Sequence, residues 1–255
     1  MTSSCLITCA SCNLRYDEPK DKHPWQERKH IMAEFFLQQK PGVIATQEGR
    51  RPQLYELFEL IQKEYHLADQ HRDYRDGRMY PALFVHKDWD IQHSTDRWLS
   101  ETPTLMGSTS FGSRWPKLGV FAEIRHKQQG QTVHVCSFHL DNVSAAARPQ
   151  QAKVLLAQLD LIYPHSAHAF LMGDANDAPH TETIQTFLKA GFKNPFEAQG
   201  ILTTYHDFGR PEHAAHIDYV FSRSGTAVSK DTFVDDRTEN FYSDHYYLSA
   251  TFALS

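Results

Sequence analysis

Apolar and polar positions alternate along the chain with two different periods, which predicts strands interspersed with amphipathic helices. An apolar run over residues 5–14 is typical of a strand. From Pro24 to Lys40, large apolar residues recur between charged ones at helical spacing, and Pro41-Gly42 ends the predicted helix. Val43 to Thr46 is predicted to form a second strand, and Gln53 to Tyr65 a further helix.

The pattern after residue 65 is β-like as far as Phe138, and beyond it strands and helices alternate again. A long helix from about Ala145 to Leu161 requires Pro149 to lie in the first turn, where its missing N–H is tolerated. A shorter helix is predicted over Thr181 to Ala190. The predicted strands of this region are Ala82–Val85, Trp98–Leu99, Leu118–Ile124, Val133–Phe138, Ala169–Met172, Ile217–Phe221 and Tyr246–Ala253.

Neither a repeat nor a Gly/Ser/Pro-rich linker divides this succession, so we predict a single mixed α/β domain over residues 1–255. The formal charge of −5 opposes long-range attraction to a polyanion, although it leaves room for a local basic pocket. No apolar run approaches the ~18 residues that span a bilayer, and the N-terminus lacks the features of a signal peptide. We therefore expect a cytoplasmic protein with no membrane span and no obligate protein partner.

Three of the four cysteines form the spacing C-x3-C-x2-C, which resembles the iron–sulfur motif of radical SAM enzymes. That motif belongs in a loop, where three thiolates can converge on one cluster. Cys5, Cys9 and Cys12 instead lie in one continuous predicted strand, which directs the first two to one face and the third to the other. The pattern therefore favours cysteines packed in the core over a cluster.

The predicted strands share a feature that points to function: most of them end in a carboxylate, amide or imidazole. Ligands of α/β proteins commonly collect at strand ends, so these side chains are predicted to form one site. Such a set of dispersed acidic and imidazole groups is what metal-assisted phosphoryl chemistry requires. The residues concerned are Asn13, Glu48, His139, Asp174, Asn176, Asp218, Asp244 and His245.

Two of these positions suggest specific chemistry. Gly173-Asp174-Ala175-Asn176 follows an apolar strand and sets a carboxylate beside an amide, with glycine expected to permit a tight turn. The carboxylate can accept a proton from water, and the amide can donate to a phosphate oxygen. Asp218 is embedded in an apolar run, where a charge needs a partner; either His139 or His245 would serve. Glu48 offers the oxygen ligand that Mg2+ or Mn2+ prefers, but taken alone this position is better explained as an exposed acid at the start of the next loop.

Taken in order, these segments resemble the endonuclease/exonuclease/phosphatase family along essentially the whole chain. The region from Trp98 to Pro103, with Gly107, Ser108 and Arg114 after it, is similar to a bacterial subgroup near the deadenylase-like branch. The same holds for Thr203 to Phe208. One departure is Gly77-Arg78, where the family often has Gly-Glu. The ordered motifs are Asn13, Gln47-Glu48, Phe138 to Asp141, Gly173 to Asn176, Ile217 to Tyr219 and Ser243 to His245.

The resemblance implies a four-layer α/β sandwich with two facing mixed sheets flanked by helices. It implies Glu48 as the principal Mg2+ (or Mn2+) ligand, with Asn13 and Asp244 nearby. Asp174 would activate the attacking water. The other roles it implies are transition-state stabilisation by Asn176, phosphate binding by His245, an acid or donor function for His139 paired with Asp218, and substrate contacts from Arg114 and Tyr80.

No Walker-type phosphate loop and no Gly-x-Ser-x-Gly elbow occur, so direct in-line attack by water is the expected mechanism. The preferred reading is a phosphodiesterase or nuclease-like hydrolase of single-stranded nucleic acid. The alternative is a phosphatase of a small phosphorylated metabolite, and a non-catalytic scaffold of the same fold is a third. Specificity is expected in the loops Arg72–Tyr80 and Leu105–Lys117. The first contains Arg72, Arg75 and Arg78 with Tyr74 and Tyr80, which could stack on and clamp a nucleotide, although a solvated charged loop explains them equally well.

Overall fold

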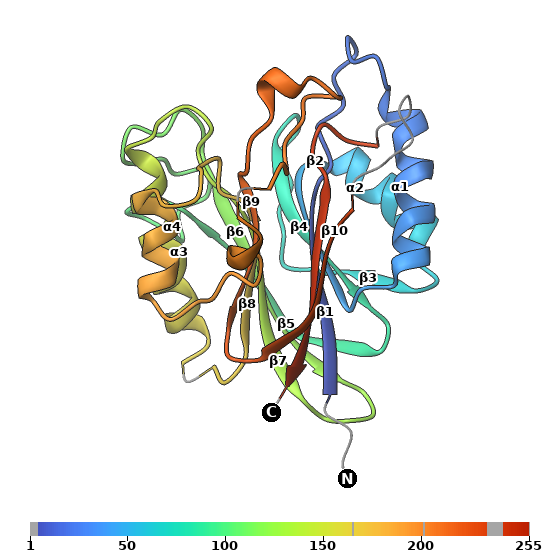
Figure 1. Cartoon of the computed structure of the whole chain (residues 1–255), viewed down its shortest axis with the longest axis vertical. Coiled ribbons are helices and arrows are strands. Elements are labelled where there is room, and N and C mark those ends of the chain that lie inside the picture. The colour runs from blue at the N-terminus through green and yellow to red at the C-terminus, as the bar shows by residue number, and fades with distance from the viewer. Residues whose placement is uncertain (1–4, 165, 201, 234–241, 255) are drawn as a thin grey trace.

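The computed structural model describes residues 5–164, 166–200, 202–233 and 242–254. Two β-sheets lie face to face, and helices cover the outer face of each (Figure 1). The predicted four-layer α/β sandwich is thus confirmed. In the described part of the chain, no helix is both long enough and apolar enough to cross a membrane. The expected cytoplasmic location stays a prediction.

The first sheet has six strands in the order β10-β11-β1-β2-β4-β3. Its central strand β1 pairs parallel with β2 and antiparallel with β11, so the two ends of the chain meet in mid-sheet. Helices α1 and α2 cover its outer face (Figure 1). The elements of this half are β1 (Cys5–Asn13), α1 (Trp25–Gln39), β2 (Val43–Arg50), α2 (Arg51–Ile61), β3 (Tyr65–Leu67), β4 (Met79–His86), β10 (Thr226–Phe233) and β11 (Tyr247–Leu254).

The second sheet has five strands in the order β5-β6-β7-β8-β9, with α3 and α4 on its outer face. Strands β7 and β8 are parallel and joined by α3, while the other pairs are antiparallel. The elements are β5 (Trp89–Trp98), β6 (Leu118–His126), β7 (Thr132–His139), α3 (Ala147–Ile162), β8 (Ala169–Asp174), α4 (Glu182–Lys189) and β9 (Asp218–Arg223), with short 3-10 turns at Glu197–Gln199 and Pro211–His213.

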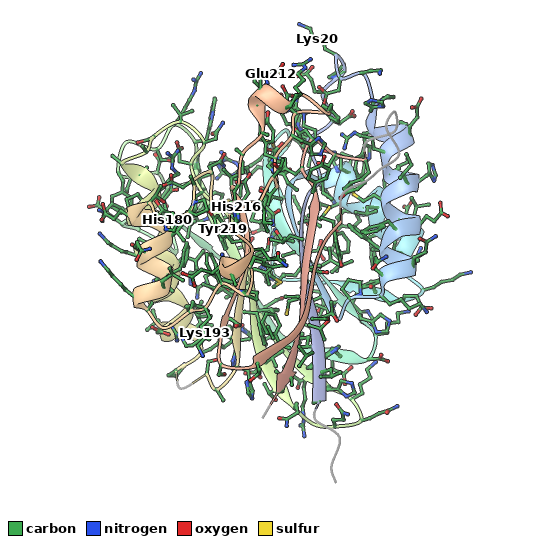
Figure 2. All side chains as sticks on the ribbon, in the orientation of Figure 1. Lys20, His180, Lys193, Glu212, His216 and Tyr219 are labelled. Carbon is green, nitrogen blue, oxygen red and sulfur yellow. The ribbon has the colours of Figure 1, made fainter. Side chains whose placement is uncertain are left out.

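Three apolar layers hold the sandwich together, and side chains fill the space between its elements (Figure 2). One lies between the two sheets, where Phe170 of β8 meets Phe252 of β11 at 4.9 Å between ring centroids. Another lies under α1 and α2, and the third under α3 and α4. Each fully buried large apolar side chain contributes about 1.5–3 kcal/mol, so these layers dominate the folding energy.

Most predicted helices and strands are present, but some of their ends differ where contacts between distant segments of the chain override the local sequence pattern. The helix predicted over Gln53 to Tyr65 instead spans Arg51 to Ile61, and Tyr65 begins β3. The reason is tertiary: the Tyr65 hydroxyl donates to the carbonyl of Pro41 (3.0 Å), and β3 pairs with β4. The sequence pattern also did not predict β3, β10 or most of β5. Pro149 does lie in the first turn of α3, as required.

The cysteine prediction is confirmed. Cys5 and Cys9 face the layer between the sheets, and Cys12 faces the layer under α1. All are buried free thiols, and burial raises the pKa of each. Thiolates directed to opposite faces of one strand do not converge on a cluster.

Candidate active site

A row of polar side chains crosses the five-stranded sheet at one end. The register aligns His139 of β7 with Asp174 of β8, and Asp174 with Asp218 of β9. All three are buried. Because β7 and β8 are parallel, their carboxyl ends coincide, and Asp218 begins the antiparallel neighbour at the same level. The row lies at the opposite end of the sandwich from the two chain termini (Figure 1).

Polar residues of the six-stranded sheet meet this row across the interface between the sheets. Asn13, the last residue of β1, donates from Nδ2 to Asp174 Oδ2 (3.2 Å). One level deeper, the side-chain amide of Gln47 donates to the hydroxyl of Ser137 (3.2 Å). Buried amides that are satisfied in this way fix the relative position of the sheets, since an unpaired one would cost about 1–3 kcal/mol. The predicted convergence of strand-end residues is therefore borne out for these segments.

Asp174 is the most constrained carboxylate of the site. Its Oδ1 accepts the backbone N–H of Asn176 (2.7 Å) in a tight turn, where Asn176 has a positive φ of 50°. The amide of Asn176 is held in turn by donation to the Leu140 carbonyl (3.1 Å). Burial and the adjacent negative charge of Asp218 raise the pKa of Asp174 to about 7. This value suits a group that exchanges protons near neutral pH.

The role expected for Gly173 was wrong. Its φ is not in the positive range; the residue is glycine because the chain passes too close to β7. A Cβ at this position would lie 2.1 Å from the carbonyl oxygen of Phe138 and 2.9 Å from its carbonyl carbon. The close approach draws β8 against β7 and aligns Asp174 with His139.

Asp218 binds His245, not His139. Nδ1 of His245 lies 2.8 Å from Asp218 Oδ2, so the pairing of His139 with Asp218 that the family resemblance implied is wrong. The physical reason is placement: His139 lies two strands away from Asp218, and its Nε2 is 3.6 Å from Asp174 Oδ2. Thr204 fixes Asp218 from behind, because its hydroxyl accepts the backbone N–H groups of Ile217 and Asp218 (3.0 Å each).

The two histidines differ in charge. Burial opposes a cation at His245, but the Asp218 carboxylate and its hydrogen bond override this and raise the pKa of His245 to about 10. Burial, together with the positive charges of Lys117 and His245, holds the pKa of His139 well below its usual range. The site therefore holds an imidazolium and a neutral imidazole side by side.

Glu48 occupies a distorted part of β2. The pairing of β2 with β4 shifts register between Thr46 and Gly49, and Glu48 has a positive φ of 63°. Such a conformation is costly for a residue with a Cβ and is often found at functional positions. Its Oε2 accepts the backbone N–H of Tyr16 (3.2 Å), and the side chain borders an open cavity. The bulge re-aims Glu48 toward the end of the sandwich.

Asn13 and Asp244 lie around the same segment as Glu48. Asn13 Oδ1 accepts the backbone N–H of Arg15 (2.9 Å), and the Arg15 guanidinium lies 3.7 Å from Asp244 Oδ2. Buried Arg28 of α1 supports this segment from below by donating to the carbonyls of Leu14 (2.6 Å) and Arg15 (3.0 Å). The segment after β1 thus contacts each of the three residues predicted as metal ligands.

The donor set fits a hard divalent cation. Glu48 and Asp244 supply carboxylate oxygens, and Asn13 supplies an amide oxygen, which are the ligands that Mg2+ and Mn2+ prefer. A second grouping is present: Asp174, Asp218 and His245 offer ligand atoms within 4.8 Å of one another. Asp218 Oδ1 is buried without a hydrogen-bond partner, which marks an electron pair available to a cation or a donor.

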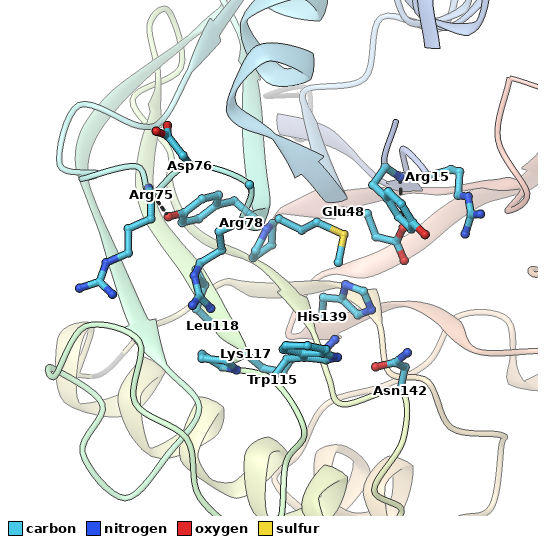
Figure 3. Close-up of a pocket in the computed structure, with 16 residues that line it drawn as sticks. Arg15, Glu48, Arg75, Asp76, Arg78, Trp115, Lys117, Leu118, His139 and Asn142 are labelled. Carbon is cyan, nitrogen blue, oxygen red and sulfur yellow. Dashed lines mark hydrogen bonds between the residues drawn. The ribbon is translucent and has the colours of Figure 1, made fainter. Parts of the chain in front are cut away.

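A cavity of about 610 Å³ opens beside these groups (Figure 3). Glu48 and His139 border it on the site side, and Trp115 and Arg78 border it further out. Tyr80, predicted to contact substrate, lies in its wall but is almost fully buried, with its hydroxyl accepting the backbone N–H of Arg75 (2.8 Å). The lining residues are Arg15, Tyr16, Glu48, Arg75, Asp76, Gly77, Arg78, Met79, Tyr80, Pro81, Trp115, Pro116, Lys117, Leu118, His139 and Asn142.

Arg114, the other predicted substrate contact, does not border the cavity. It is exposed, its guanidinium stacks over the Trp115 ring at 5.5 Å, and its backbone N–H donates to Asp141 Oδ2 (3.0 Å). Asp141 also accepts the hydroxyl of Ser113 (2.7 Å) and thereby anchors the loop. The structure thus assigns Asp141 a structural role at the mouth of the cavity.

Lys117 and Trp115 were not predicted individually as site residues, whereas Arg78 lies in the loop Arg72–Tyr80 that was expected to contact substrate. Burial lowers the pKa of Lys117, although the charges of Glu48 and Asp174 oppose that shift. No motif marks Lys117 or Trp115. One signal was present for Lys117: a lone cation immediately before the apolar strand β6, at the same end as the other polar strand termini. Arg72, in the loop expected to clamp a nucleotide, is instead buried in an ion pair with Asp96 (2.7 Å).

Comparisons with known proteins agree with this geometry. The solved structures that match include an endonuclease/exonuclease/phosphatase from Bacteroides vulgatus (24% identity, TM-score 0.91), which covers 98% of this chain and 100% of that one. A mannosyl-6-phosphatase of Bacteroides thetaiotaomicron shares 22% identity with a TM-score of 0.80, covering 97% and 100% of the two chains. D. rerio TDP2, solved with a single-strand DNA product, shares 17% identity with a TM-score of 0.77 and covers 98% and 99%.

At these identities the solved structures show the fold alone. No curated protein matches the sequence significantly. The model of the Endonuclease/Exonuclease/phosphatase family, however, matches residues 10–245, a span that includes every strand-end residue described above. The chain therefore belongs to the endonuclease/exonuclease/phosphatase family and is a phosphoric ester hydrolase.

Proposed function

We propose that this protein cleaves a phosphate ester by in-line attack of an activated water, with Mg2+ or Mn2+ bound at Glu48, and that its first substrate class is a phosphodiester. The observation that carries the proposal is a cluster of buried polar side chains beside the cavity that Glu48 borders. The cluster is centred on Asp174 and also contains Asn13, His139 and the Asp218–His245 pair. It combines a base, a cationic donor and oxygen ligands within one site.

Asp174 is the proposed base. Its Oδ2 is held by Asn13 and its Oδ1 by the backbone of Asn176, so the carboxylate is fixed in one orientation. A pKa raised to about 7 makes it a stronger proton acceptor than an ordinary carboxylate. It would take the proton of a water that attacks the phosphorus directly, with no covalent enzyme intermediate.

His245 is the proposed phosphate donor. Its Nδ1 is held by Asp218, which leaves Nε2 to donate to a phosphate oxygen while the ring carries a positive charge. Neutral His139, whose Nε2 lies 3.6 Å from Asp174 Oδ2, and the amide of Asn176, which donates to the Leu140 carbonyl, lie nearby as further donors. Preorganised donors of this kind stabilise the charge that develops on phosphate oxygens in the transition state.

Glu48, Asn13 and Asp244 are the proposed ligands of the divalent ion. When bound, the cation would neutralise the charge that otherwise keeps an anionic ester and hydroxide apart. Glu48 meets the cavity with one oxygen held by Tyr16, an arrangement that restricts its rotamer before any ion binds.

A phosphodiester is favoured by a second hollow next to the first. Arg50, Arg51 and Tyr55 line it together with Arg75, which it shares with the active-site cavity. Positive charge therefore continues away from the reacting groups, as a strand with successive phosphates requires. The structural resemblance to TDP2, which was solved with a single-strand DNA product, is consistent with this class.

A phosphatase of a small metabolite is the second candidate. The cavity volume of about 610 Å³ falls in the range of ordinary small-molecule sites. The mannosyl-6-phosphatase among the similar structures acts on such a compound. Arg114 and Tyr80 stay predictions as substrate contacts, with Tyr80 restricted to a wall position.

The test is hydrolysis of a paired panel with and without Mg2+ or Mn2+. One half holds single-stranded RNA, single-stranded DNA and bis-p-nitrophenyl phosphate, and the other holds sugar and nucleotide monophosphates. We expect metal-dependent turnover that Asp174→Asn abolishes and that Asp160→Asn, an exposed carboxylate on α3, retains. Preference for the monophosphate half would replace the diesterase by the phosphatase, and absence of turnover on every compound would refute the proposal.

A further inference from the structure

The active-site cavity is basic although the protein as a whole is acidic. Four cationic side chains line it, Arg15, Arg75, Arg78 and Lys117, against the two carboxylates Glu48 and Asp76. Arg15 is committed to Asp21 (2.9 Å). Within the described ranges 5–164, 166–200, 202–233 and 242–254, no carboxylate oxygen lies within 4.0 Å of the cationic groups of the other three.

Lys117 belongs to the reacting centre, because the charges acting on it are those of Glu48, Asp174 and Asp141. Arg75 and Arg78 stand apart from it in the loop before β4. Figure 3 shows Arg78 reaching from this wall toward the opposite one, where Trp115 lies, with Arg75 further from Glu48 and His139. The cavity thus has a reacting end and a separate cationic end.

Local contacts hold the cationic end in place without neutralising it. The Arg78 guanidinium lies over the ring of Trp98 at 5.5 Å, and Nε of Arg75 donates to the sulfur of Met106 (3.1 Å). Neither contact carries charge, so both guanidinium groups keep their forked donors for an anion. By contrast, Arg72 in the same loop donates from two guanidinium nitrogens to Asp96, so those donors are not free for a ligand.

Trp115 provides a flat surface between the two ends. It borders the cavity with 55% of its surface exposed, and Arg114 stacks on its ring. An exposed tryptophan in a polar cavity is suited to stack on a base or to pack against a sugar ring. A ligand that carried such a group at Trp115 would extend from the reacting end toward Arg78.

We propose that Arg75 and Arg78 form a second anion subsite, so that the preferred substrate carries a second phosphate group beyond the scissile one. This inference rests on the proposed phosphoester hydrolysis, but it holds for both substrate classes above. In a strand the second group is the next phosphate, and in a metabolite it is a distal phosphate on the same carrier. Asp76 lies between the two arginines in the sequence and is exposed, so solvent screens its negative charge.

The test compares ligand pairs that differ only in the second phosphate. The pairs are adenosine 3′,5′-bisphosphate against adenosine 5′-monophosphate, fructose 1,6-bisphosphate against fructose 6-phosphate, and the dinucleotide ApA with and without a 5′-phosphate. Binding to the full-length protein is measured by calorimetry in EDTA, where no turnover occurs. Turnover of the same pairs is then measured with Mg2+. The three carriers separate a nucleotide, a sugar and a strand as the source of the second phosphate.

We expect the doubly phosphorylated member of at least one pair to bind at least about tenfold more tightly, as charge-assisted hydrogen bonds predict. Arg78→Gln and Arg75→Gln should each reduce that preference several-fold, and the double variant should remove it. Arg125→Gln, which changes an exposed arginine of β6 outside the cavity, should leave it intact.

Two results would overturn the subsite: no pair with a tenfold preference in the wild-type protein, or a preference that survives in the double variant. Neither depends on catalysis. Hydrolysis of bis-p-nitrophenyl phosphate and the monophosphates by the wild-type protein decides the proposed function separately. If the protein hydrolyses these esters but shows no preference for a second phosphate, the proposed function stands and the subsite is refuted. If it shows the preference but hydrolyses none of the esters, only the proposed function is refuted.

Discussion

Nδ1 of His245 lies 2.8 Å from Oδ2 of Asp218, although the two residues come from segments that flank β10 and only meet in the folded chain. The pair converts a buried histidine, which would ordinarily be neutral, into a cation. This reversal of charge is the basis of the donor role proposed for His245, and His139 stays neutral beside Asp174.

Asp218→Asn tests the cationic state of His245. Without the carboxylate, burial is unopposed, so the pKa of His245 should fall from about 10 to below its ordinary value. Activity near pH 8 should drop by about 100-fold, and the alkaline limb of the pH–kcat/KM profile should move to lower pH. Asp160→Asn should leave the profile unchanged. An unaltered alkaline limb in Asp218→Asn would show that the pair does not set this charge.

The same shift has a consequence for stability. The folded-state pKa of His245 is raised, so the pair stabilises the fold fully below the unfolded value of about 6.5, and this contribution is lost as pH rises toward about 10. Urea denaturation of the wild-type protein between pH 7 and 10 should show this decline, and Asp218→Asn should flatten it.

Asp174→Asn removes the proposed base while preserving the size of the side chain. We expect kcat to fall by about 10²–10⁴-fold, with substrate binding largely retained. In the wild-type protein, activity should rise with pH through an acid limb at or below pH 7, because a bound cation would bring the raised pKa of this carboxylate down from about 7. Loss of binding without loss of kcat would identify Asp174 as a substrate contact instead.

Glu48→Gln tests the proposed metal ligand. A neutral amide is a much weaker ligand for Mg2+, so activity at 1–5 mM Mg2+ should fall by roughly 100-fold or more. The rise in melting temperature that Mg2+ gives the wild-type protein should shrink in the variant, which provides a readout independent of turnover. Glu59→Gln, an exposed acid on α2, serves as control. Full Mg2+ stabilisation in Glu48→Gln would move the metal to the group of Asp174, Asp218 and His245.

Asp96→Asn probes the fold apart from the chemistry. Arg72 is almost fully buried, and losing its partner leaves an uncompensated charge that costs about 3–5 kcal/mol of unfolding free energy. Burial alone would raise the pKa of Asp96, but the ion pair with Arg72 overrides this and lowers that pKa to about 2.

The ion pair of Asp96 with Arg72 therefore stabilises the folded state by about 2–3 kcal/mol at pH values above about 4, the pKa of Asp96 in the unfolded chain. This stabilisation is lost as the pH falls toward 2. Denaturant titrations from pH 6 to 2.5 measure it. Asp90→Asn, at an exposed position of the same strand, should change stability by less than about 0.5 kcal/mol.

Much of the fold followed from local pattern. The apolar runs that became β1, β2, β7 and β8 are long and bounded by turn residues, so hydrophobic burial leaves them few alternatives. Strands β3 and β10 and most of β5 were missed because they lie at the edges of the sheets, where the pairing partner rather than the strand's own sequence specifies the strand. The end of α2 was misplaced for the same reason, since Tyr65 is drawn away by Pro41 and β4.

The sequence by itself determined which residue types end the strands, and hence that carboxylates, amides and imidazoles gather at one end of the sandwich. Only the tertiary structure decided how they pair. Asp218 could have met His139 or His245, and strand register selects His245. Gly173 is needed for a contact with Phe138 that no local pattern encodes. Trp115 and Lys117 carry no motif, because a side chain belongs to a cavity through the fold around it and not through its neighbours in sequence.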